Sequence, residues 1–376
     1  MKETAIYIHI PFCDHKCIYC DFYSIISYEN VKPYLLSLKK EIRYFAEKFF
    51  SDREIISIFF GGGTPSFMET DYIGEIIEEI KKNFSVKPDA EITLETNPGT
   101  VAAGKLEKFL NIGINRISIG IQSFDENELR FLTRIHNPAA AKQTVLDAKH
   151  SGFKNISIDL IFNLPGQTKD IWRSNLEQSL YLPINHISAY SLILEPGTML
   201  NKMVIDGKVK LHDDEYDADL YEITIEYLTQ NGFTQYEVSN FAKEGFESVH
   251  NNAYWRYKDY IGFGTSAHSF VDGVRWWNYS SLKFYIESVN KINNAVIRQE
   301  RLTQKQKLDE YIMLALRSKG LDRIDFEKRF KTDLLNKKRE LITLLLNNNF
   351  IRINNGLISL TPKGYAVCDE ILKRFL

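Results

Sequence analysis

Hydrophobic residues fall into short apolar runs that alternate with longer stretches in which apolar positions recur every three or four residues. The short runs are rich in β-branched and aromatic residues, which is typical of buried strands. They predict six strands, at residues 5–10, 54–60, 91–96, 116–122, 155–162 and 186–194. The longer stretches predict amphipathic helices at residues 31–50, 71–84, 102–110, 139–150 and 169–180.

Repetition of strand and helix predicts an α/β fold in which a parallel sheet is arranged as a barrel. In barrels of this kind the loops after the strands meet at one end, and chemistry is found there. We therefore expect functional residues directly after each strand.

The C-terminal part follows a different pattern, in which helices are followed by two short strands that meet at Asn354, Asn355 and Gly356. This order predicts a winged helix-turn-helix. We expect a barrel at residues 1–240, a connecting segment at 241–300 and this domain at 301–376. Residues 300–376 hold 16 Lys and Arg against 10 Asp and Glu, so a DNA-binding regulator is one alternative. We prefer a solvated basic face and expect no nucleic-acid partner.

The composition, 44% hydrophobic and 26% charged with a net charge of −2, is that of a globular protein. No apolar run approaches the roughly 18 residues that cross a bilayer, and the first residues lack a signal-peptide pattern. We therefore expect a cytoplasmic protein. Disulfides are rare in that reducing compartment, so closely spaced cysteines indicate metal binding or redox chemistry.

Three of the four cysteines follow the first strand in FCDHKCIYCDF, as Cys13, Cys17 and Cys20. Thiolates are the usual ligands of cubane clusters of four irons, and three of them leave one iron open for a chelating cofactor. Tyr19 and Phe22 within this loop would shield a cluster from water. The alternative is a zinc site completed by His9 or His15. Zinc is less favoured, because structural zinc sites usually show two paired sets of ligands and the sequence has no second CxxC.

Glycine and polar residues follow the next strands in the same way. They are Gly62, Gly63 and Thr64 in GGGTPS, Glu95 in LETNPG, Gln122 in GIQSF, and Asp159 within the fifth strand. Taken singly, such residues are more often turns, caps or solvated loop positions. At successive strand ends they are expected to converge on one opening of the barrel.

These motifs resemble the radical S-adenosylmethionine (SAM) superfamily. The closer resemblance is to the coproporphyrinogen III dehydrogenase-like branch and, within it, to the HemW-type heme chaperones. The motifs occur in the family's order along almost the whole chain: YIHIPFC, CIYCDF, GGGTPS, LETNP, NRISIGIQSF, LTRIH, DLIFNLPGQT, YEVSNFA, HNNAYW and GFGTSAHS. The resemblance implies a partial (β/α)6 TIM-like radical SAM barrel with a C-terminal winged-helix-like α+β domain.

The resemblance also implies roles for single residues. Cys13, Cys17 and Cys20 would bind a [4Fe-4S] cluster whose open iron binds SAM. The SAM contacts would come from Tyr7, Gly62, Gly63, Thr64, Glu95, Gln122, Arg134, Asp159 and Ile193. His250 in HNNAYW would bind heme iron, for which imidazole is a common ligand. Without the resemblance, a lone His or a helix-end Arg such as Arg134 is more often structural.

Two departures from the family pattern concern loops. Asn163 stands where the family usually has Gly, and Thr265 and Ser266 stand where small glycines are often seen. Asn tolerates the left-handed conformation better than other residues with a side chain, so we expect the turn at Asn163 to be retained.

Two features favour the chaperone over the dehydrogenase of the branch. The dehydrogenase carries CxxxCxxCxC, whereas position 22 is Phe, and only about six residues precede Tyr7. We therefore expect a heme chaperone that binds a [4Fe-4S] cluster, SAM and heme and passes heme to acceptor proteins, and we assign no catalytic residue. The alternative is the oxygen-independent coproporphyrinogen III dehydrogenase. Membrane-associated acceptors and a dimer are left open.

Overall fold

Six parallel strands form the centre of the structure, a computed structural model that describes residues 1–49 and 52–376. They are β1 (Lys2–Ile10), β2 (Arg53–Gly62), β3 (Ser85–Thr96), β4 (Arg116–Gln122), β5 (Asn155–Phe162) and β6 (His186–Ser191). Each is parallel to the next, so all six end at the same edge. The six predicted strands are therefore confirmed, although the last one ends at Ser191 rather than at residue 194.

Six further strands extend this sheet. They are β7 (Thr234–Gln235), β8 (Asn240–Ala242), β9 (Asp259–Phe263), β10 (His268–Val271), β11 (Val274–Asn278) and β12 (Val296–Arg301). The order in the sheet is β12-β11-β10-β9-β1-β2-β3-β4-β5-β6-β8-β7. Four strands of the expected connecting segment thus belong to the main sheet, with β9 parallel to β1. The boundaries predicted at residues 240 and 300 stay a prediction.

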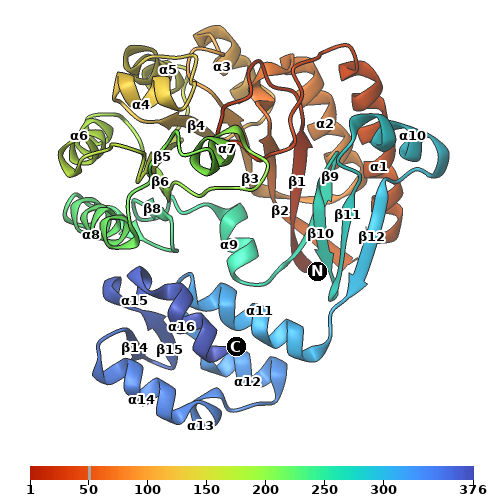
Figure 1. Ribbon diagram of the computed structural model, residues 1–376. Helices are drawn as coiled ribbons and strands as arrows, with labels where there is room; N and C mark the ends of the chain where they lie inside the picture. The colour runs from red at the N-terminus through yellow and green to blue at the C-terminus, as the bar shows by residue number, and fades with distance from the viewer. Residues whose placement is uncertain (50–51) are drawn as a thin grey trace.

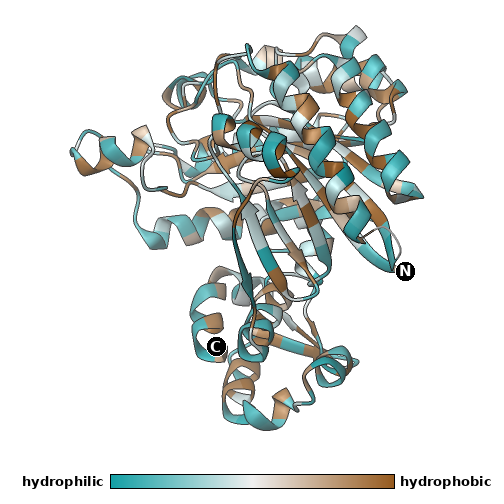
Figure 2. Ribbon diagram, turned by 90° about the vertical axis from the view of Figure 1, so that its right-hand side faces the viewer, coloured by the Kyte–Doolittle hydropathy of each residue, from teal (hydrophilic) through white to brown (hydrophobic). Residues whose placement is uncertain are grey.

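Helices surround the sheet, and most of them cover its outer face, whereas α9 (Val249–Trp255) contacts Ser57 and Glu91 on the inner face (Figure 1). They are α1 (Val31–Phe49), α2 (Thr70–Asn83), α3 (Ala103–Asn111), α4 (Glu126–Phe131), α5 (Pro138–His150), α6 (Lys169–Leu180), α7 (Met199–Ile205), α8 (Asp214–Gln230), α9 (Val249–Trp255) and α10 (Leu282–Ile292). All five predicted helices are among them, and the predicted end of the first at residue 50 lies outside the described residues. In Figure 2 brown residues are prominent on the strands and teal ones on the outer helices.

The core lies between the strands and the outer helices. Side chains alternate between the two faces of a strand, so Ile6, Ile8 and Ile10 of β1 are fully buried on one side. Tyr7 and His9 alternate with them and point to the other side of β1. The outer face is therefore apolar, and the inner face is left for polar side chains. Among the described residues, no helix is long and apolar enough to cross a membrane.

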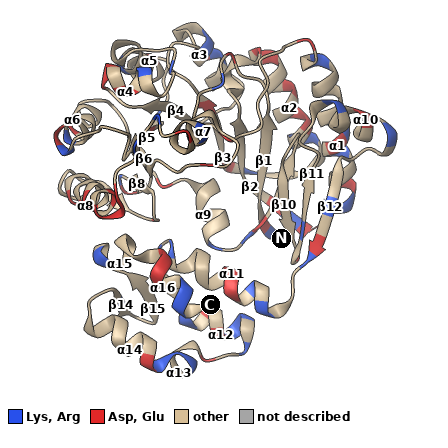
Figure 3. Ribbon diagram, in the orientation of Figure 1, with Lys and Arg blue, Asp and Glu red and all other residues tan. Residues whose placement is uncertain are grey.

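The C-terminal domain has its own sheet and its own core, below the barrel in Figure 1. It contains α11 (Gln304–Leu316), β13 (Leu321–Asp322), α12 (Arg323–Phe330), α13 (Leu334–Lys337), α14 (Arg339–Asn347), β14 (Ile351–Asn354), β15 (Leu357–Leu360), α15 (Pro362–Ala366) and α16 (Cys368–Phe375). The predicted hairpin is confirmed as β14 and β15, with Asn355 and Gly356 both at positive φ. Figure 3 shows charges of both signs on its helices.

Candidate functional site

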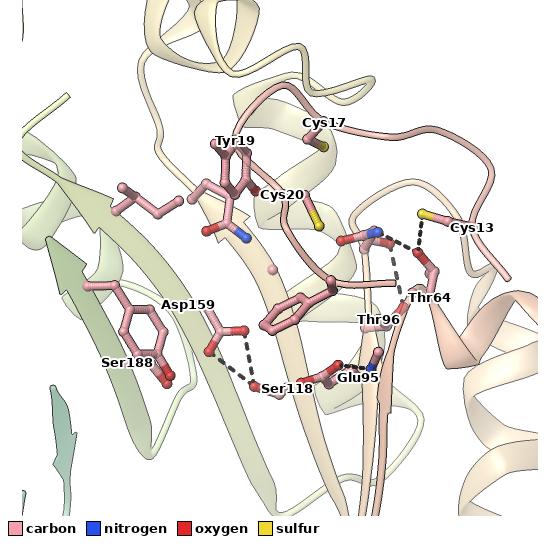
Figure 4. Close-up of a pocket in the computed structure, with 18 of the residues that line it drawn as sticks. Cys13, Cys17, Tyr19, Cys20, Thr64, Glu95, Thr96, Ser118, Asp159 and Ser188 are labelled. Atoms are coloured by element: carbon pink, nitrogen blue, oxygen red, sulfur yellow. Dashed lines mark hydrogen bonds between the residues drawn. The ribbon is translucent and has the colours of Figure 1, made fainter. Parts of the chain in front are cut away.

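A cavity of about 500 Å³ opens at the C-terminal edge of the strands. Figure 4 shows side chains from several strands and from the loop after β1 around it. Most residues of the predicted site line this cavity: Cys13, Cys17, Tyr19, Cys20, Gly62, Gly63, Thr64, Glu95, Gln122, Arg134, Asp159 and Ile193. Tyr7 and His250 are not among its lining residues. The residues that the sequence places at successive strand ends are thus brought together, although up to about 180 residues separate them along the chain.

The cysteine loop is anchored at both of its ends by backbone hydrogen bonds. Cys13 N donates to Ile25 O at 2.9 Å, and Ile25 N donates to Pro11 O at 2.7 Å. Within the loop, Cys20 N donates to Cys17 O at 3.2 Å. These bonds hold the three thiols at the mouth of the cavity.

Each thiol has a different neighbour in the cavity. Cys13 Sγ is 3.2 Å from Thr64 Oγ1, and Cys17 Sγ accepts a hydrogen bond from Arg134 Nη1 at 3.5 Å. Burial raises the pKa of the Cys20 thiol. Figure 4 shows the three sulfur atoms around the same part of the cavity. Thiolate is the form of cysteine that binds metal.

The donor set fits a cluster of several irons. In a cubane each thiolate binds a different iron, so the sulfur atoms need to surround a group rather than meet at one point. Across residues 1–49 and 52–376, no three His, Cys, Asp or Glu side chains converge as the ligands of one ion do. Of the two histidines proposed to complete a zinc site, His9 has both nitrogens engaged, with Nε2 2.9 Å from Tyr23 O and Nδ1 3.1 Å from Tyr7 Oη. His15 lines the cavity, and its Nε2 lies 3.4 Å from Thr133 Oγ1.

The glycine loop after β2 lies against the chain itself. Gly62 has a φ of 112°, and a Cβ there would lie 2.7 Å from the His9 ring. A Cβ on Gly63 would lie 2.5 Å from Phe12 O. Neither position tolerates a side chain, because the contacts are below the normal approach of two atoms. The glycines therefore bring Thr64 into contact with the cysteine loop.

Two buried acids, Glu95 and Asp159, line the cavity. Burial and the charge of Asp159 raise the pKa of Glu95 to about 8, and a hydrogen bond from Gly62 N at 3.2 Å opposes this shift. Burial also raises the pKa of Asp159, against hydrogen bonds from Ser188 and Ser118. Ser118 Oγ lies 3.2 Å from Asp159 Oδ1. Two acids in one cavity favour a cationic ligand, which would lower both pKa values.

Arg134 supplies a cation to the same site. Its Nη2 donates to Asn97 Oδ1 at 2.6 Å and to Gly120 O at 2.7 Å. Its Nε is buried and has no hydrogen-bond partner among the described residues. An orphaned guanidinium N–H suits a ligand with a carboxylate. A ligand that is cationic at one end and anionic at the other, as SAM is, therefore fits this part of the cavity.

The loop beside Arg134 is strained at Gln122, which has a φ of 73° although it carries a side chain. Such positions are uncommon and cluster at functional sites. A Cβ on Gly120 would lie 2.9 Å from Gln122 Nε2, so glycine there makes room for this side chain. Asn163 has a φ of 61°, and the left-handed turn expected at this position is confirmed.

Two predicted residues are less enclosed than the sequence suggested, and a third does not line the cavity. Ile193 is 67% exposed at the cavity mouth, and Phe22, expected to shield a cluster, is 62% exposed. Tyr7 lies outside the cavity, where its hydroxyl contacts His9 and its ring stacks on Phe59 with centroids 6.2 Å apart.

His250 is a core residue in this structure. It is 2% exposed on α9, and its ring stacks on Phe59 with centroids 4.9 Å apart. Nδ1 lies 3.0 Å from Ser57 Oγ, and Nε2 lies 3.0 Å from Tyr254 Oη. Burial lowers the pKa of His250 to about 3. In this arrangement neither ring nitrogen of His250 is free to bind iron, and its assignment as the heme ligand stays a prediction.

Sequence reasoning missed several polar residues of the site. Asn97 joins Arg134 to the glycine loop, since its Nδ2 donates to Thr64 Oγ1 at 2.8 Å. Its position two residues after Glu95 in LETNPG was a usable signal. Ser118 and Ser188 lie within strands, and no local pattern distinguishes a serine that faces the cavity from any other.

Comparisons with known proteins agree with this geometry. A family model described as the radical SAM superfamily matches residues 7–177, and one described as the HemN C-terminal domain matches residues 302–367. The heme chaperone HemW of Lactococcus lactis is 33% identical over 100% of this chain and 98% of its own length. The heme chaperone HemW of Bacillus subtilis is 33% identical over 99% of each chain.

A solved structure gives the same result for the fold. The coproporphyrinogen III oxidase HemN of Escherichia coli, described as a radical SAM enzyme, is 25% identical and has a TM-score of 0.84, covering 100% of this chain and 90% of that chain. The predicted barrel with its C-terminal domain is thereby confirmed. This chain belongs to the radical SAM superfamily and, within it, to the family of the HemW proteins.

Proposed function

We propose that this chain is a heme chaperone, which binds a [4Fe-4S] cluster, SAM and heme and transfers heme to acceptor proteins. The likeness along the full chain to two proteins named heme chaperone HemW carries the proposal. The donors in the cavity support the cofactor part of it, because thiols, paired acids and a free guanidinium N–H meet in one place.

Cys13, Cys17 and Cys20 would hold the cluster through their thiolates. A cluster and SAM bound together supply reductive one-electron chemistry. Arg134 Nε would donate to the carboxylate of SAM, and the acid pair would face its cationic groups. The remaining proposed SAM contacts are Tyr7, Tyr19, Gly62, Gly63, Thr64, Gln122 and Ile193. Tyr7 does not line the cavity, so its side chain would have to move to touch SAM.

His250 stays the proposed heme ligand, but α9 must rearrange before iron can reach it. Tyr254 and Trp255 follow it on the same helix and would supply flat apolar area for a porphyrin face. Acceptor proteins are the proposed partners, and the cytoplasm is the proposed location. None of the four cysteines forms a disulfide, and the reducing cytoplasm keeps thiols in this form.

The test combines reconstitution with heme titration. Anaerobic protein should take up iron and sulfide without stoichiometric zinc, and heme should produce a Soret band that shifts or weakens in His250→Ala. His150→Ala, at the exposed end of α5, is the control and should leave the band unchanged. Wild-type protein without a Soret change would contradict heme binding.

The likeness to the HemN structure favours one second candidate, the coproporphyrinogen III dehydrogenase. Steady turnover of coproporphyrinogen III by the reconstituted protein would support it over the chaperone. Phe22 stands where that enzyme's motif has a further Cys, and for this reason we expect no turnover.

A further inference from the structure

A buried carboxylate on β3 holds the start of the helix that carries the HNNAYW motif. Glu91 is 6% exposed. Its Oε1 accepts hydrogen bonds from Ser248 Oγ at 3.2 Å and from His250 N at 3.0 Å, and its Oε2 accepts one from Val249 N at 3.1 Å. The first N–H groups of a helix lack partners within the helix, so a carboxylate there satisfies them and complements the helix dipole.

The neighbouring strand holds the side chain of the same histidine. Ser57 of β2 pairs with Glu91 of β3 in the sheet. Ser57 Oγ contacts His250 Nδ1, while Glu91 accepts from the backbone N–H of His250. Two adjacent positions of the sheet therefore fix both the main chain and the ring of one residue. Tyr254 Oη engages the remaining ring nitrogen from one turn further along α9.

Contacts with the sheet and with the C-terminal domain hold α9 in its position. Figure 1 shows it between the sheet and α11 of the C-terminal domain. After its end, Tyr257 Oη donates to Glu310 Oε2 at 2.8 Å, which joins this segment to α11. Val249, in contrast, is 40% exposed at the first turn. The start of the helix is held by polar contacts with Glu91 and by the buried ring of His250, which stacks on Phe59. The polar contacts can be exchanged for water when the helix moves.

We propose that Glu91 is a positioning residue that latches α9, and that heme binding at His250 requires this latch to open. The inference rests on the proposed function, because it takes His250 as the heme ligand. While the latch is closed, both ring nitrogens are engaged and iron has no ligand. The apparent heme affinity is then the affinity of the open form multiplied by the fraction of molecules that are open. Loosening the latch therefore tightens heme binding.

Glu91→Gln tests the latch by heme titration. The variant keeps the size of the side chain but replaces one acceptor oxygen with a donor that faces backbone N–H groups. We expect the apparent heme Kd to fall about tenfold or more, with the Soret maximum at the wild-type position. Ser57→Ala frees the ring without touching the helix start and should act in the same direction with a smaller effect.

The matched control is Glu41→Gln. Glu41 is another fully buried carboxylate with three donors, Gly264 N at 3.0 Å, Asn278 Nδ2 at 2.7 Å and Tyr285 Oη at 2.7 Å. None of these donors belongs to α9, so this variant should bind heme as the wild type does. An equal gain in Glu41→Gln would overturn the latch, because it would show a general loosening of the fold.

The outcomes separate the two proposals. If wild-type protein gives a His250-dependent Soret band and folded Glu91→Gln binds heme equally or more weakly, the latch alone is overturned. If the wild type gives no such band, the proposed function and the latch both fail. Should Glu91→Gln not fold, hydrogen exchange on the wild type decides: heme should speed the exchange of the Val249 and His250 amides, and unchanged or slower exchange overturns the latch.

Discussion

At the scale of single residues, Glu95 decides the charge of the cavity. Its pKa of about 8 reflects burial first and the charge of Asp159 second. Near neutral pH Glu95 therefore holds a proton in the empty protein. A cation that binds beside it must displace that proton, so ligand affinity and pH are linked.

This linkage predicts that SAM binds more tightly as the pH rises from 6 to 7.5, by up to about tenfold per pH unit. Isothermal titration calorimetry at several pH values measures the effect. Glu95→Gln should bind SAM more weakly and lose the pH dependence. In Asp159→Asn the rise of SAM affinity with pH should begin at lower pH, because the charge of Asp159 no longer raises the pKa of Glu95. A wild-type affinity that does not change with pH would contradict this role for Glu95.

The chemistry of the site could be predicted from the sequence where it is local, and not where it depends on other strands. Cys13, Cys17 and Cys20 lie in one loop, and their spacing alone indicates a metal site. The environment of His250 is different. Its ring and backbone are held by Ser57 and Glu91, which are more than 150 residues away in the chain, and no pattern around HNNAYW reports them.

At the scale of elements, Arg53 joins the beginning of β2 to the strands added at the other side of β1. It is 1% exposed, and its guanidinium contacts Asp259 of β9 at 2.5 Å and Asp272 at 2.7 Å. Asp272 lies in the turn between β10 and β11. Removing Arg53 leaves Asp259, whose side chain is 14% exposed, without its partner in a largely buried position, which is costly.

We expect Arg53→Met to lower the free energy of unfolding by about 3 kcal/mol. Lys2→Met removes a cation from the same Asp272, but both partners of that pair are 54% exposed, so the loss should stay below about 1 kcal/mol. Urea denaturation of both variants measures the difference. Equal losses of unfolding free energy in the two variants would show that the burial of Arg53 adds nothing to the stability of its ion pairs.

The central strands were predictable because they are continuous apolar runs, whereas β9 to β12 were not. These later strands have four to six residues, and glycine or charged residues interrupt most of them. Most of β12 is exposed on both faces, so it shows no alternation of apolar and polar residues. Their place in the sheet follows from the pairing of β9 with β1, a contact between distant parts of the chain.

At the scale of the whole molecule, buried carboxyls predict a loss of stability in mildly alkaline solution. Burial raises the pKa of Glu41 to about 7 and that of Glu237 to about 7. With Glu95, these groups keep protons in the folded state that the unfolded chain has already released. The free energy of unfolding therefore falls as the pH rises from the unfolded carboxyl pKa of about 4.5 to about 8.

Buried histidines with lowered pKa values, such as His9 and His250, oppose this trend only below about pH 6.5, where the unfolded chain binds protons. We therefore expect stability to decrease above pH 6.5, by up to about 1.4 kcal/mol per pH unit for each carboxyl. Glu41 and Glu237 contribute to this loss up to about pH 7, and Glu95 contributes up to about pH 8. Denaturant unfolding across this range measures the slope. Glu41→Gln should make the slope shallower, and an unchanged slope would rule out Glu41 as a source.

The parallel pairing of β1 with β9 joins Thr4 to Asp259 and has a consequence for synthesis on the ribosome. One edge of the first strand cannot find its partner until more than two thirds of the polypeptide has been translated. During that interval the nascent chain carries an unpaired β edge, which invites association with other chains. Holdase chaperones acting on the emerging polypeptide should therefore improve its yield, and truncation before β9 should produce aggregates.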